Sequence, residues 1–422
     1  MAEGSRDVAA ERGSVLRIVA MSILRITPML RFRSAVLSPF RPHRYPAELV
    51  RRLGVACILL LLAPSARAQA LSDAARARLD SVVDAYVAAG AFTGVVAIGD
   101  HGRMVYQAVR GDADREWHVP LAPDAVFRIG STTKQFTAAL VLTLVEEGRV
   151  RLDGHVADYL PDYPRPQGER ITIHHLLTHT SGIPEYVGRD DFFRVSAPAP
   201  HTPADLVARF ANLPLEFEPG SRWSYSNGNY VLLGAIVERV TGQSYAQALR
   251  ARITEPLGLR DTGVDADSAV LPRRVRAYFA DGGTVMNEAH VDASSAFGAG
   301  FLHSTARDLL AWDAALADGR PFRDPATAAR LFTPYVATGT PLGGYGYGWF
   351  IGPQTLGGRT VRVVQHGGTI SGFVTGFWRM PDDRRAVIVL ANTRAAATTG
   401  LVAALADALY GGHPTLPSPQ PH

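Results

Sequence analysis

A chain of 422 residues, 47% of them hydrophobic, is long enough to bury a large core in one domain or in two interlocked domains. Its formal net charge is +4, but residues 1–68 alone carry +7, from 11 arginines against 4 acidic residues, which leaves −3 for residues 69–422. This mildly acidic body excludes a nucleic-acid partner held by charge. The single cysteine, Cys57, excludes an intramolecular disulfide and a metal site built from thiolates.

The arginine-rich start of the chain predicts an export signal. Arg51-Arg52 precede an apolar run at residues 53–62, and Ala66-Arg67-Ala68 follows as an A-x-A cleavage site. We therefore expect a signal peptide at residues 51–68, after a basic leader at residues 1–50 that is disordered or reflects a misassigned start. An uncleaved anchor is the alternative, but the run is too short to span a bilayer. The predicted location is periplasmic or extracellular, with no stable membrane span after cleavage.

The hydrophobic pattern places strands near both ends of the remaining chain and helices between them. In order, we expect a helix over 71–89, strands over 93–99 and 104–109, a mainly helical stretch over 111–342, strands over 360–366, 372–380 and 386–391, and a helix over 398–410. The Pro-rich tail at residues 413–422 is expected to be disordered.

This order of elements predicts an α+β fold for a domain over residues 69–412. One antiparallel sheet is assembled from both chain ends and flanked by the terminal helices, and a large, mostly helical lobe is inserted between them. A cleft between the sheet and the lobe is the expected place for a site that takes a small-molecule or peptide substrate.

Lys134 is the only lysine in the chain, beside 42 arginines. Arginine stays protonated in proteins, whereas a buried lysine can lose its proton, so a lone lysine suits a role that needs a neutral amine. Ser131 lies three residues earlier, at the start of a predicted helix, where positions i and i+3 share a face. The alternative is an ordinary surface lysine.

Two later segments carry further candidates. Tyr225-Ser226-Asn227 precedes an apolar helix, and a tyrosine beside an amine can act as a general base if its anion is stabilised. His366-Gly367-Gly368-Thr369 follows a strand, and its glycines allow a ligand to approach the backbone. The alternatives are an aromatic turn that caps a helix and a glycine bulge that ends a strand.

His175 and His179 are four residues apart on a predicted helix, a spacing that also occurs in zinc sites. No glutamate stands at the position that an H-E-x-x-H motif requires, and no clear third ligand follows. We therefore predict no metal and no cofactor, and expect a helix end packed near a site.

Ser131-x-x-Lys134, Tyr225-x-Asn227 and His366-x-Gly368, in this order, resemble the motifs of the serine β-lactamase and penicillin-binding protein superfamily. The most similar branch holds class C β-lactamases, D-alanyl-D-alanine carboxypeptidases and related esterases. The resemblance covers about residues 71–410 and implies a β-lactamase/transpeptidase-like fold. It also implies a serine hydrolase acting on a β-lactam, a D-amino-acid peptide or an ester.

The resemblance implies a role for each matched residue. Ser131 would be acylated, and Lys134 would accept its proton or hold Tyr225 as an anion. Tyr225 would act as general base on Ser131 and on the deacylating water, and Asn227 would bind the substrate amide and Lys134. The N–H groups of Ser131 and Thr369 would form the oxyanion hole.

His366 departs from the family pattern, because many members have Lys-Thr-Gly where this chain has His366-Gly367-Gly368. A histidine is only partly charged near neutral pH, which weakens the expectation that penicillins and cephalosporins are good substrates. Arg394 could supply the missing charge or be a solvated surface arginine. Two alternatives to turnover remain: a sensor that is acylated but deacylates too slowly, and an inactive structural relative.

Overall fold

A computed structural model describes residues 70–189, 192–281, 283–395 and 397–419. The predicted signal peptide and basic leader lie outside these residues. The described residues contain no helix with the length and apolar character needed to cross a bilayer.

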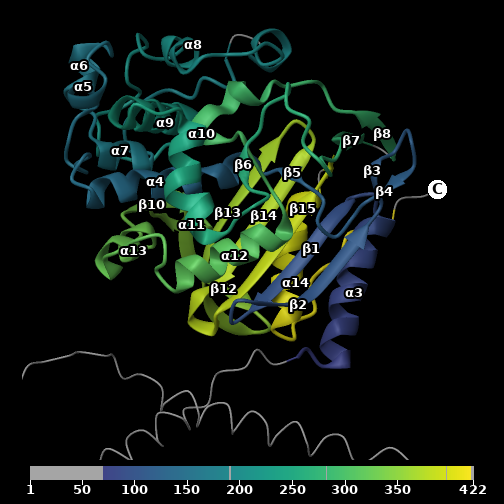
Figure 1. Cartoon of the computed structure of the whole chain (residues 1–422). Coiled ribbons are helices and arrows are strands. Elements are labelled where there is room, and N and C mark those ends of the chain that lie inside the picture. Colours follow the sequence, from purple (N-terminus) through teal and green to yellow (C-terminus); the bar gives the residue numbers. More distant parts are fainter. Residues whose placement is uncertain (1–69, 190–191, 282, 396, 420–422) are drawn as a thin grey trace, which may run out of the picture. The chain divides into compact units, whose positions relative to one another are not determined.

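The central element is an eight-stranded antiparallel sheet built from both ends of the described chain (Figure 1). Its strands run in the spatial order β10-β11-β12-β13-β14-β15-β1-β2. They are β1 (Gly94–Asp100), β2 (Arg103–Arg110), β10 (Val336–Thr340), β11 (Gly343–Tyr345), β12 (Phe350–Leu356), β13 (Arg359–Ile370), β14 (Phe373–Met380) and β15 (Arg385–Ala391). The predicted pairing of the two chain ends is confirmed, because β1 lies between β2 and β15.

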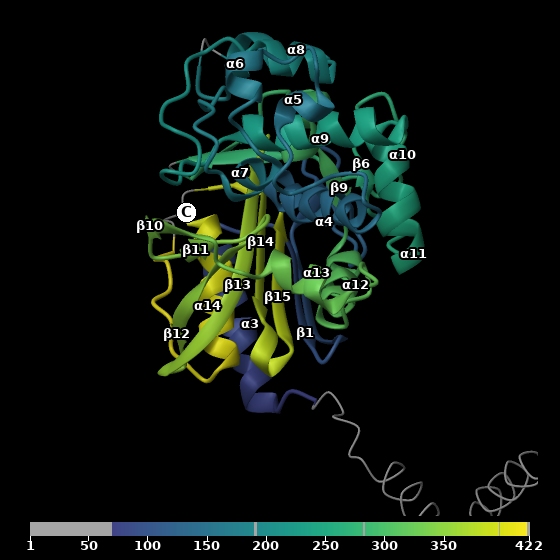
Figure 2. The same cartoon turned by 90° about the vertical axis from the view of Figure 1, so that its left-hand side faces the viewer.

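Helices cover both faces of this sheet. The first and last helices, α3 (Asp73–Ala88) and α14 (Leu401–Leu409), contact each other and form one apolar layer with the sheet. Helix α12 (Ala306–Ala317) packs against β1 and β15 on the opposite face (Figure 2). The α+β prediction with flanking terminal helices is therefore confirmed.

The inserted lobe is organised around α4 (Thr133–Glu146), whose residues 133–144 are all buried. A helix buried on every side lies inside a domain, and Phe136 of α4 stacks on Trp312 at 4.5 Å between ring centroids. The other helices are α5 (Val156–Tyr159), α6 (Arg165–Gly168), α7 (Ile173–Thr178), α8 (Pro203–Ala208), α9 (Asn227–Thr241), α10 (Tyr245–Leu249), α11 (Glu255–Leu257) and α13 (Pro325–Leu331).

Short helical turns and small strands connect these elements. The turns are η1 (Gly130–Thr132), η2 (Phe192–Ser196), η3 (Arg250–Thr254), η4 (Ala293–Ala299), η5 (Pro381–Asp383) and η6 (Thr398–Gly400). The small sheets are β5-β9-β6, β16-β7-β8 and β3-β4. Their strands are β3 (Asp112–Asp114), β4 (Val119–Pro120), β5 (Phe127–Arg128), β6 (Gly263–Val264), β7 (Tyr278–Asp281), β8 (Thr284–Asn287), β9 (Leu302–Ser304) and β16 (Thr393–Arg394).

Two parts of the sheet differ from the prediction. Strand β10 lies within the stretch expected to be helical, and β11 and β12 lie just after it. Together they extend the sheet by three strands. The predicted end of a strand at His366 is wrong: β13 continues through the glycines to Ile370, paired with β14 without a bulge. The ladder to β14 supplies the hydrogen bonds that keep these glycines extended.

Candidate active site

Ser131 lies in η1, the turn that leads directly into α4. Gly130 precedes it with φ of 51°, a left-handed conformation that glycine adopts without strain. The N-terminal end of a helix leaves backbone N–H groups without intrahelical partners. The serine side chain is thus presented on a rigid buried element, beside backbone donors.

Lys134 is fully buried, and its Nζ contacts three oxygen atoms. It lies 2.8 Å from Asn227 Oδ1, 2.8 Å from the carbonyl of Ala299 and 3.1 Å from Ser131 Oγ. The first two can only accept hydrogen bonds, so they use the two hydrogens of a neutral amine and leave its lone pair facing Ser131 Oγ. Burial lowers the pKa of Lys134 to about 7, against an opposing effect from the charge of Glu185.

Glu185 is a site residue that the sequence motifs did not reveal. Its Oε2 accepts hydrogen bonds from the backbone N–H of Asn227 at 2.9 Å and from Asn227 Nδ2 at 2.8 Å. Because Nδ2 is committed to Glu185, Oδ1 must face Lys134. Glu185 lies in a loop before η2, and nothing in its neighbouring sequence marks it.

Tyr225 lies immediately before α9 and is half-buried beside Ser131. Lys134 Nζ is 4.8 Å from the centre of its ring. Burial raises the pKa of the Tyr225 phenol, and a hydrogen bond with the Ser131 side chain lowers it in part. The phenol is therefore protonated in this structure, which favours Lys134 over a tyrosine anion as the acceptor of the Ser131 proton.

The end of β13 forms the second wall of the site. The ladder between β12 and β13 stops at the Phe350–Gln365 pair, so His366–Ile370 have β14 on one side and η1 on the other. A Cβ atom on Gly368 would lie 2.8 Å from the Ser131 nitrogen, and one on Gly130 would lie 2.8 Å from the Thr369 nitrogen. The glycines thus let the backbones of η1 and β13 approach closely where the two nitrogens of the expected oxyanion hole lie.

His366 belongs to this wall but is only 3% exposed. Its Nε2 lies 3.2 Å from the Tyr345 hydroxyl, and its Nδ1 lies 2.6 Å from the Gly367 carbonyl. Burial, followed by the charge of Lys134, lowers the pKa of His366 to about 3. The ring is therefore neutral at physiological pH, rather than partly charged as expected from the sequence.

Two hollows meet at Ser131 and Thr369. The larger has a volume of about 470 Å³ and is lined by Tyr225, by residues 365–369 of β13 and by apolar side chains that include Phe350 and Trp378. The smaller, of about 70 Å³, is lined by Asn227 and by Tyr186, Val187, Phe192, Val291 and Ile370, among others. Neither lining contains an arginine or a lysine among the described residues.

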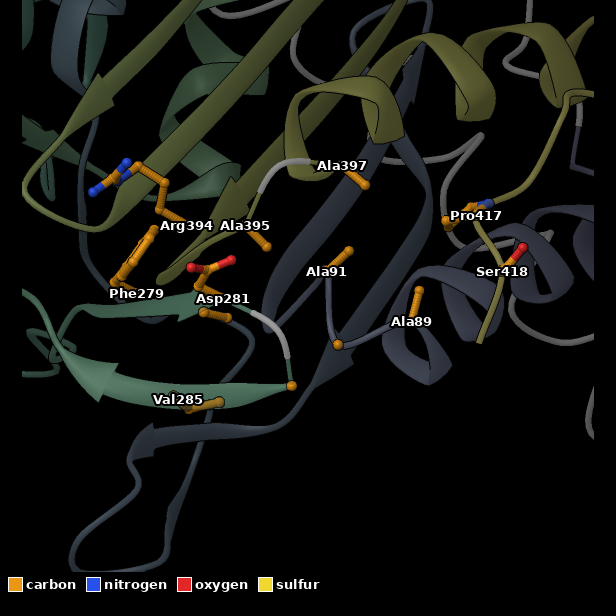
Figure 3. A pocket seen from close by; sticks show the side chains of 13 residues that line it. Ala89, Ala91, Phe279, Asp281, Val285, Arg394, Ala395, Ala397, Pro417 and Ser418 are labelled. Atoms are coloured by element: carbon orange, nitrogen blue, oxygen red, sulfur yellow. The ribbon is translucent and has the colours of Figure 1, made fainter. Parts of the chain in front are cut away.

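Arg394 lines a separate cavity of about 490 Å³ (Figure 3). Its guanidinium is ion-paired with Glu288 at 3.0 Å and lies over the ring of Phe279. In Figure 3, Pro417 and Ser418 of the C-terminal tail border the same cavity. Arg394 is therefore not the cation that replaces the family's lysine beside Ser131.

The two histidines considered for a metal are engaged separately. His175 Nδ1 accepts a hydrogen bond from Thr172 N–H at the start of α7, whereas His179 closes the helix and packs against Tyr225. The expectation of a helix end near the site is confirmed.

One group of three potential metal ligands, Asp267, His290 and Asp292, occurs among the described residues. Asp267 is already paired with Arg128 and with the backbone N–H of Ala293. We assign no ion to this group.

Comparisons with known proteins identify the family of the chain. The β-lactamase family matches residues 79–411. The chain is 31% identical to penicillin-binding protein 4* of Bacillus subtilis (strain 168) over 320 residues, 71% of this chain and 68% of that protein. It is 41% identical to esterase EstB of Burkholderia gladioli over 221 residues, 49% of this chain and 55% of the esterase, so the match spans about half the length of that relative.

Among solved structures, a D-stereospecific amidohydrolase from Streptomyces sp. has a TM-score of 0.69 at 31% identity, covering 78% of this chain and 98% of that one. The match to the family extends over most of the chain and includes the segments that carry Ser131, Lys134, Tyr225 and His366. The chain therefore belongs to the β-lactamase family of serine hydrolases.

Proposed function

We propose that this serine hydrolase cleaves carboxylic esters with uncharged acyl groups, through a covalent acyl-enzyme on Ser131. The observation that carries the proposal is the contact set of Lys134 Nζ, with two acceptors on its hydrogens and Ser131 Oγ at 3.1 Å. An amine held in this way is a base for the serine and not a structural cation.

In acylation, the Ser131 hydroxyl gives its proton to the Lys134 lone pair while Oγ forms a bond to the ester carbonyl carbon. Negative charge develops on the carbonyl oxygen, which faces the N–H groups of Ser131 and Thr369 in the gap between η1 and β13. The bond to the leaving oxygen then breaks. The Tyr225 phenol donates a proton to that oxygen and recovers one from Lys134, which returns to the neutral amine.

Deacylation repeats the sequence with water as the nucleophile. Water transfers one proton to the neutral Lys134 and attacks the acyl carbon, and Ser131 Oγ leaves with that proton. The net reaction consumes one ester and one water and releases one acid and one alcohol. Asn227, held by Glu185, lines the smaller hollow, and we propose that the second hydrogen of its Nδ2 binds a polar group on the acyl part.

The preference for uncharged substrates follows from the charges around Ser131. His366 stands where many relatives have a lysine, yet it is buried and neutral. Arg394 is paired with Glu288 in another cavity. A substrate carboxylate would lose its hydration without gaining a cation, which is costly in a partly enclosed site. Penicillins and cephalosporins carry such a carboxylate.

A substrate screen of the chain from Gln69 onward tests this proposal. We expect steady turnover of p-nitrophenyl esters, much slower turnover of a chromogenic cephalosporin and of D-Ala-D-Ala peptides, and no turnover of any substrate by Ser131→Ala. Faster turnover of the cephalosporin than of the esters would refute the preference. A burst equal to the enzyme concentration without steady turnover would assign the chain to the acylated sensors instead.

We further propose that the enzyme is exported to the periplasm or beyond the cell. The support is the pattern of residues 51–68, with two arginines, an apolar run and an A-x-A site. N-terminal sequencing of the protein recovered outside the cytoplasm should begin at Gln69. An intact leader on the active protein would contradict this proposal.

A further inference from the structure

His179 contacts three successive residues of the segment that carries Tyr225. Its backbone carbonyl accepts a hydrogen bond from Ser224 N–H at 3.0 Å, and its Nδ1 accepts one from Ser226 N–H at 3.2 Å. Between them, its ring stacks on the Tyr225 ring, with 4.4 Å between centroids and 29° between planes. One side chain therefore holds both the ring of Tyr225 and the backbone that follows it.

The hydrogen bonds of His179 also determine its protonation state. A backbone N–H can only donate, so Nδ1 is an acceptor and the proton of the neutral ring is on Nε2. Asn229 Nδ2 lies 3.0 Å from the same nitrogen, and Ser181 Oγ donates to Asn229 Oδ1 at 2.5 Å. Burial, followed by the charges of Lys134 and His366, lowers the pKa of His179 well below its usual range.

The rest of the His179 ring packs against aromatic side chains. Within the described part of the chain, the fully buried Nε2 has no hydrogen-bond partner. The centroid of the His179 ring lies 4.9 Å from that of the Tyr345 ring and 5.1 Å from that of the Tyr230 ring. The ring of His179 therefore packs against the rings of Tyr225, Tyr230 and Tyr345.

The backbone of His179 also has a conformation that is rare for a residue with a side chain. The residue ends α7 with φ of 57° and ψ of 38°, in the left-handed region that non-glycine residues seldom adopt. This conformation turns the chain at the end of α7, and the ring packs against Tyr225. The backbone conformation of His179 is thus part of the contact with Tyr225, and the acylation steps themselves do not use His179.

Building on the proposed function, we propose that His179 is a positioning residue that fixes the ring plane of Tyr225 and so directs its phenol toward Ser131 Oγ. It acts through Tyr225 and does not exchange a proton with the substrate. The stacked ring restricts rotation of the tyrosine side chain, and the bond to Ser226 N–H prevents the loop from withdrawing. Small displacements of a proton donor are enough to reduce turnover strongly.

The test compares His179→Asn with His174→Asn in the full chain. Asparagine tolerates the left-handed backbone and keeps an acceptor near Nδ1, but it removes the ring under Tyr225. His174 is the matched control, because it lies on the same helix, is half-buried and contacts the Tyr347 hydroxyl at 2.8 Å, outside both hollows.

We expect His179→Asn to lower kcat on a p-nitrophenyl ester by about 10- to 100-fold. Its KM, its Tm to within a few degrees and the acid limb of its pH profile should stay unchanged, and His174→Asn should keep the parent kcat. An unchanged kcat in His179→Asn would overturn the proposal. So would a shifted acid limb, because it would show that His179 itself titrates during turnover.

A second variant and a second readout cover loss of folding and loss of turnover. His179→Phe keeps a ring against Tyr225 and loses the Nδ1 acceptor. Its turnover per active site, with active sites counted by fluorophosphonate labelling, should be faster than that of His179→Asn. An equal or slower rate contradicts the proposal. If the parent chain hydrolyses no ester, the proposed function fails by itself. The rate of Ser131 labelling then decides, with slower labelling of His179→Asn supporting the proposal and an equal rate overturning it.

Discussion

The burial of Lys134 makes a quantitative prediction about stability. Its pKa falls from an ordinary value of 10.5 to about 7 in the folded chain. Each pKa unit corresponds to about 1.4 kcal/mol, so protonation inside the fold is disfavoured by roughly 5 kcal/mol relative to the unfolded chain. Between pH 7 and 10.5 the unfolded state therefore binds the proton that the folded state releases, and stability rises with pH through this window.

Lys134→Met isolates this effect above pH 7, because a thioether does not titrate and the folded-state histidines whose pKa depends on Lys134 are neutral there in both proteins. We expect the free energy of unfolding of the variant, minus that of the parent chain, to be larger at pH 7 than at pH 10 by roughly 3 kcal/mol. Urea unfolding of both proteins at pH 7, 8.5 and 10 measures the difference. A difference that is constant across these pH values would refute the depressed pKa of Lys134.

The same property predicts the catalytic effect of a change that preserves the positive charge. A guanidinium with a pKa above 12 is unprotonated in fewer than about one molecule in 10⁵ at pH 7. Lys134→Arg should therefore lower kcat/KM by at least about 1,000-fold while Ser131 is still present. In the parent chain, kcat/KM should fall below pH 7 as the amine is protonated. Activity of Lys134→Arg near the parent level would refute the assignment of the base.

Three further predictions follow from the site. A Cβ on Gly368 would lie 2.8 Å from the backbone nitrogen of Ser131, whereas one on Gly188 would meet no atom within 4 Å. Gly368→Ala should therefore abolish fluorophosphonate labelling and lower Tm, and Gly188→Ala should do neither. Normal labelling of Gly368→Ala would contradict the close approach of β13 to Ser131. The charge of Glu185 raises the pKa of Lys134, so Glu185→Gln should move the acid limb of kcat/KM to lower pH, and a limb that stays in place or moves upward would contradict this coupling. Because burial lowers the pKa of His366 to about 3, the unfolded state binds a proton that the folded state excludes between pH 6.5 and 3. This contribution to stability is complete above pH 6.5 and declines by about 1.4 kcal/mol per pH unit on acidification. Urea unfolding of His366→Gln should therefore show a shallower loss of stability between pH 6 and 4 than the parent chain, and an equal slope would count against a neutral, buried ring.

The elements at the two chain ends were predictable because their patterns are local. Strands β1 and β15 arise from nearly continuous apolar runs, β14 is rich in aromatic and β-branched residues, and α14 is rich in alanine and leucine. By contrast, β10 and β11 contain glycine and polar residues and have few buried positions. They are strands because β11 pairs with β12 and β10 pairs in turn with β11, which a single-sequence pattern does not reveal.

The candidate site divides in the same way. Ser131 and Lys134 could be paired from their spacing on one helix, and the Tyr225-x-Asn227 pattern identified their partners. Glu185 could not be predicted, because its role depends on a tertiary contact with Asn227, 42 residues away. His366 was expected to be partly charged, whereas its neutrality follows from burial among aromatic rings, which its sequence neighbours do not specify.

The sheet's assembly from both chain ends has a consequence for biogenesis. Strand β1 pairs with β15 from Gly94–Ala391 to Asp100–Arg385, and Arg385 Nε donates to Asp100 Oδ2 across 285 residues of chain. Pairings between residues so distant in sequence slow folding, because a long loop must close before they form. During synthesis, β1 remains an apolar strand without its partner until β15 has emerged, and such strands template aggregation. Deletion of the last 40 residues would remove β15 and α14 together, and the yield of active enzyme will depend on how long the nascent chain is protected before its two ends meet.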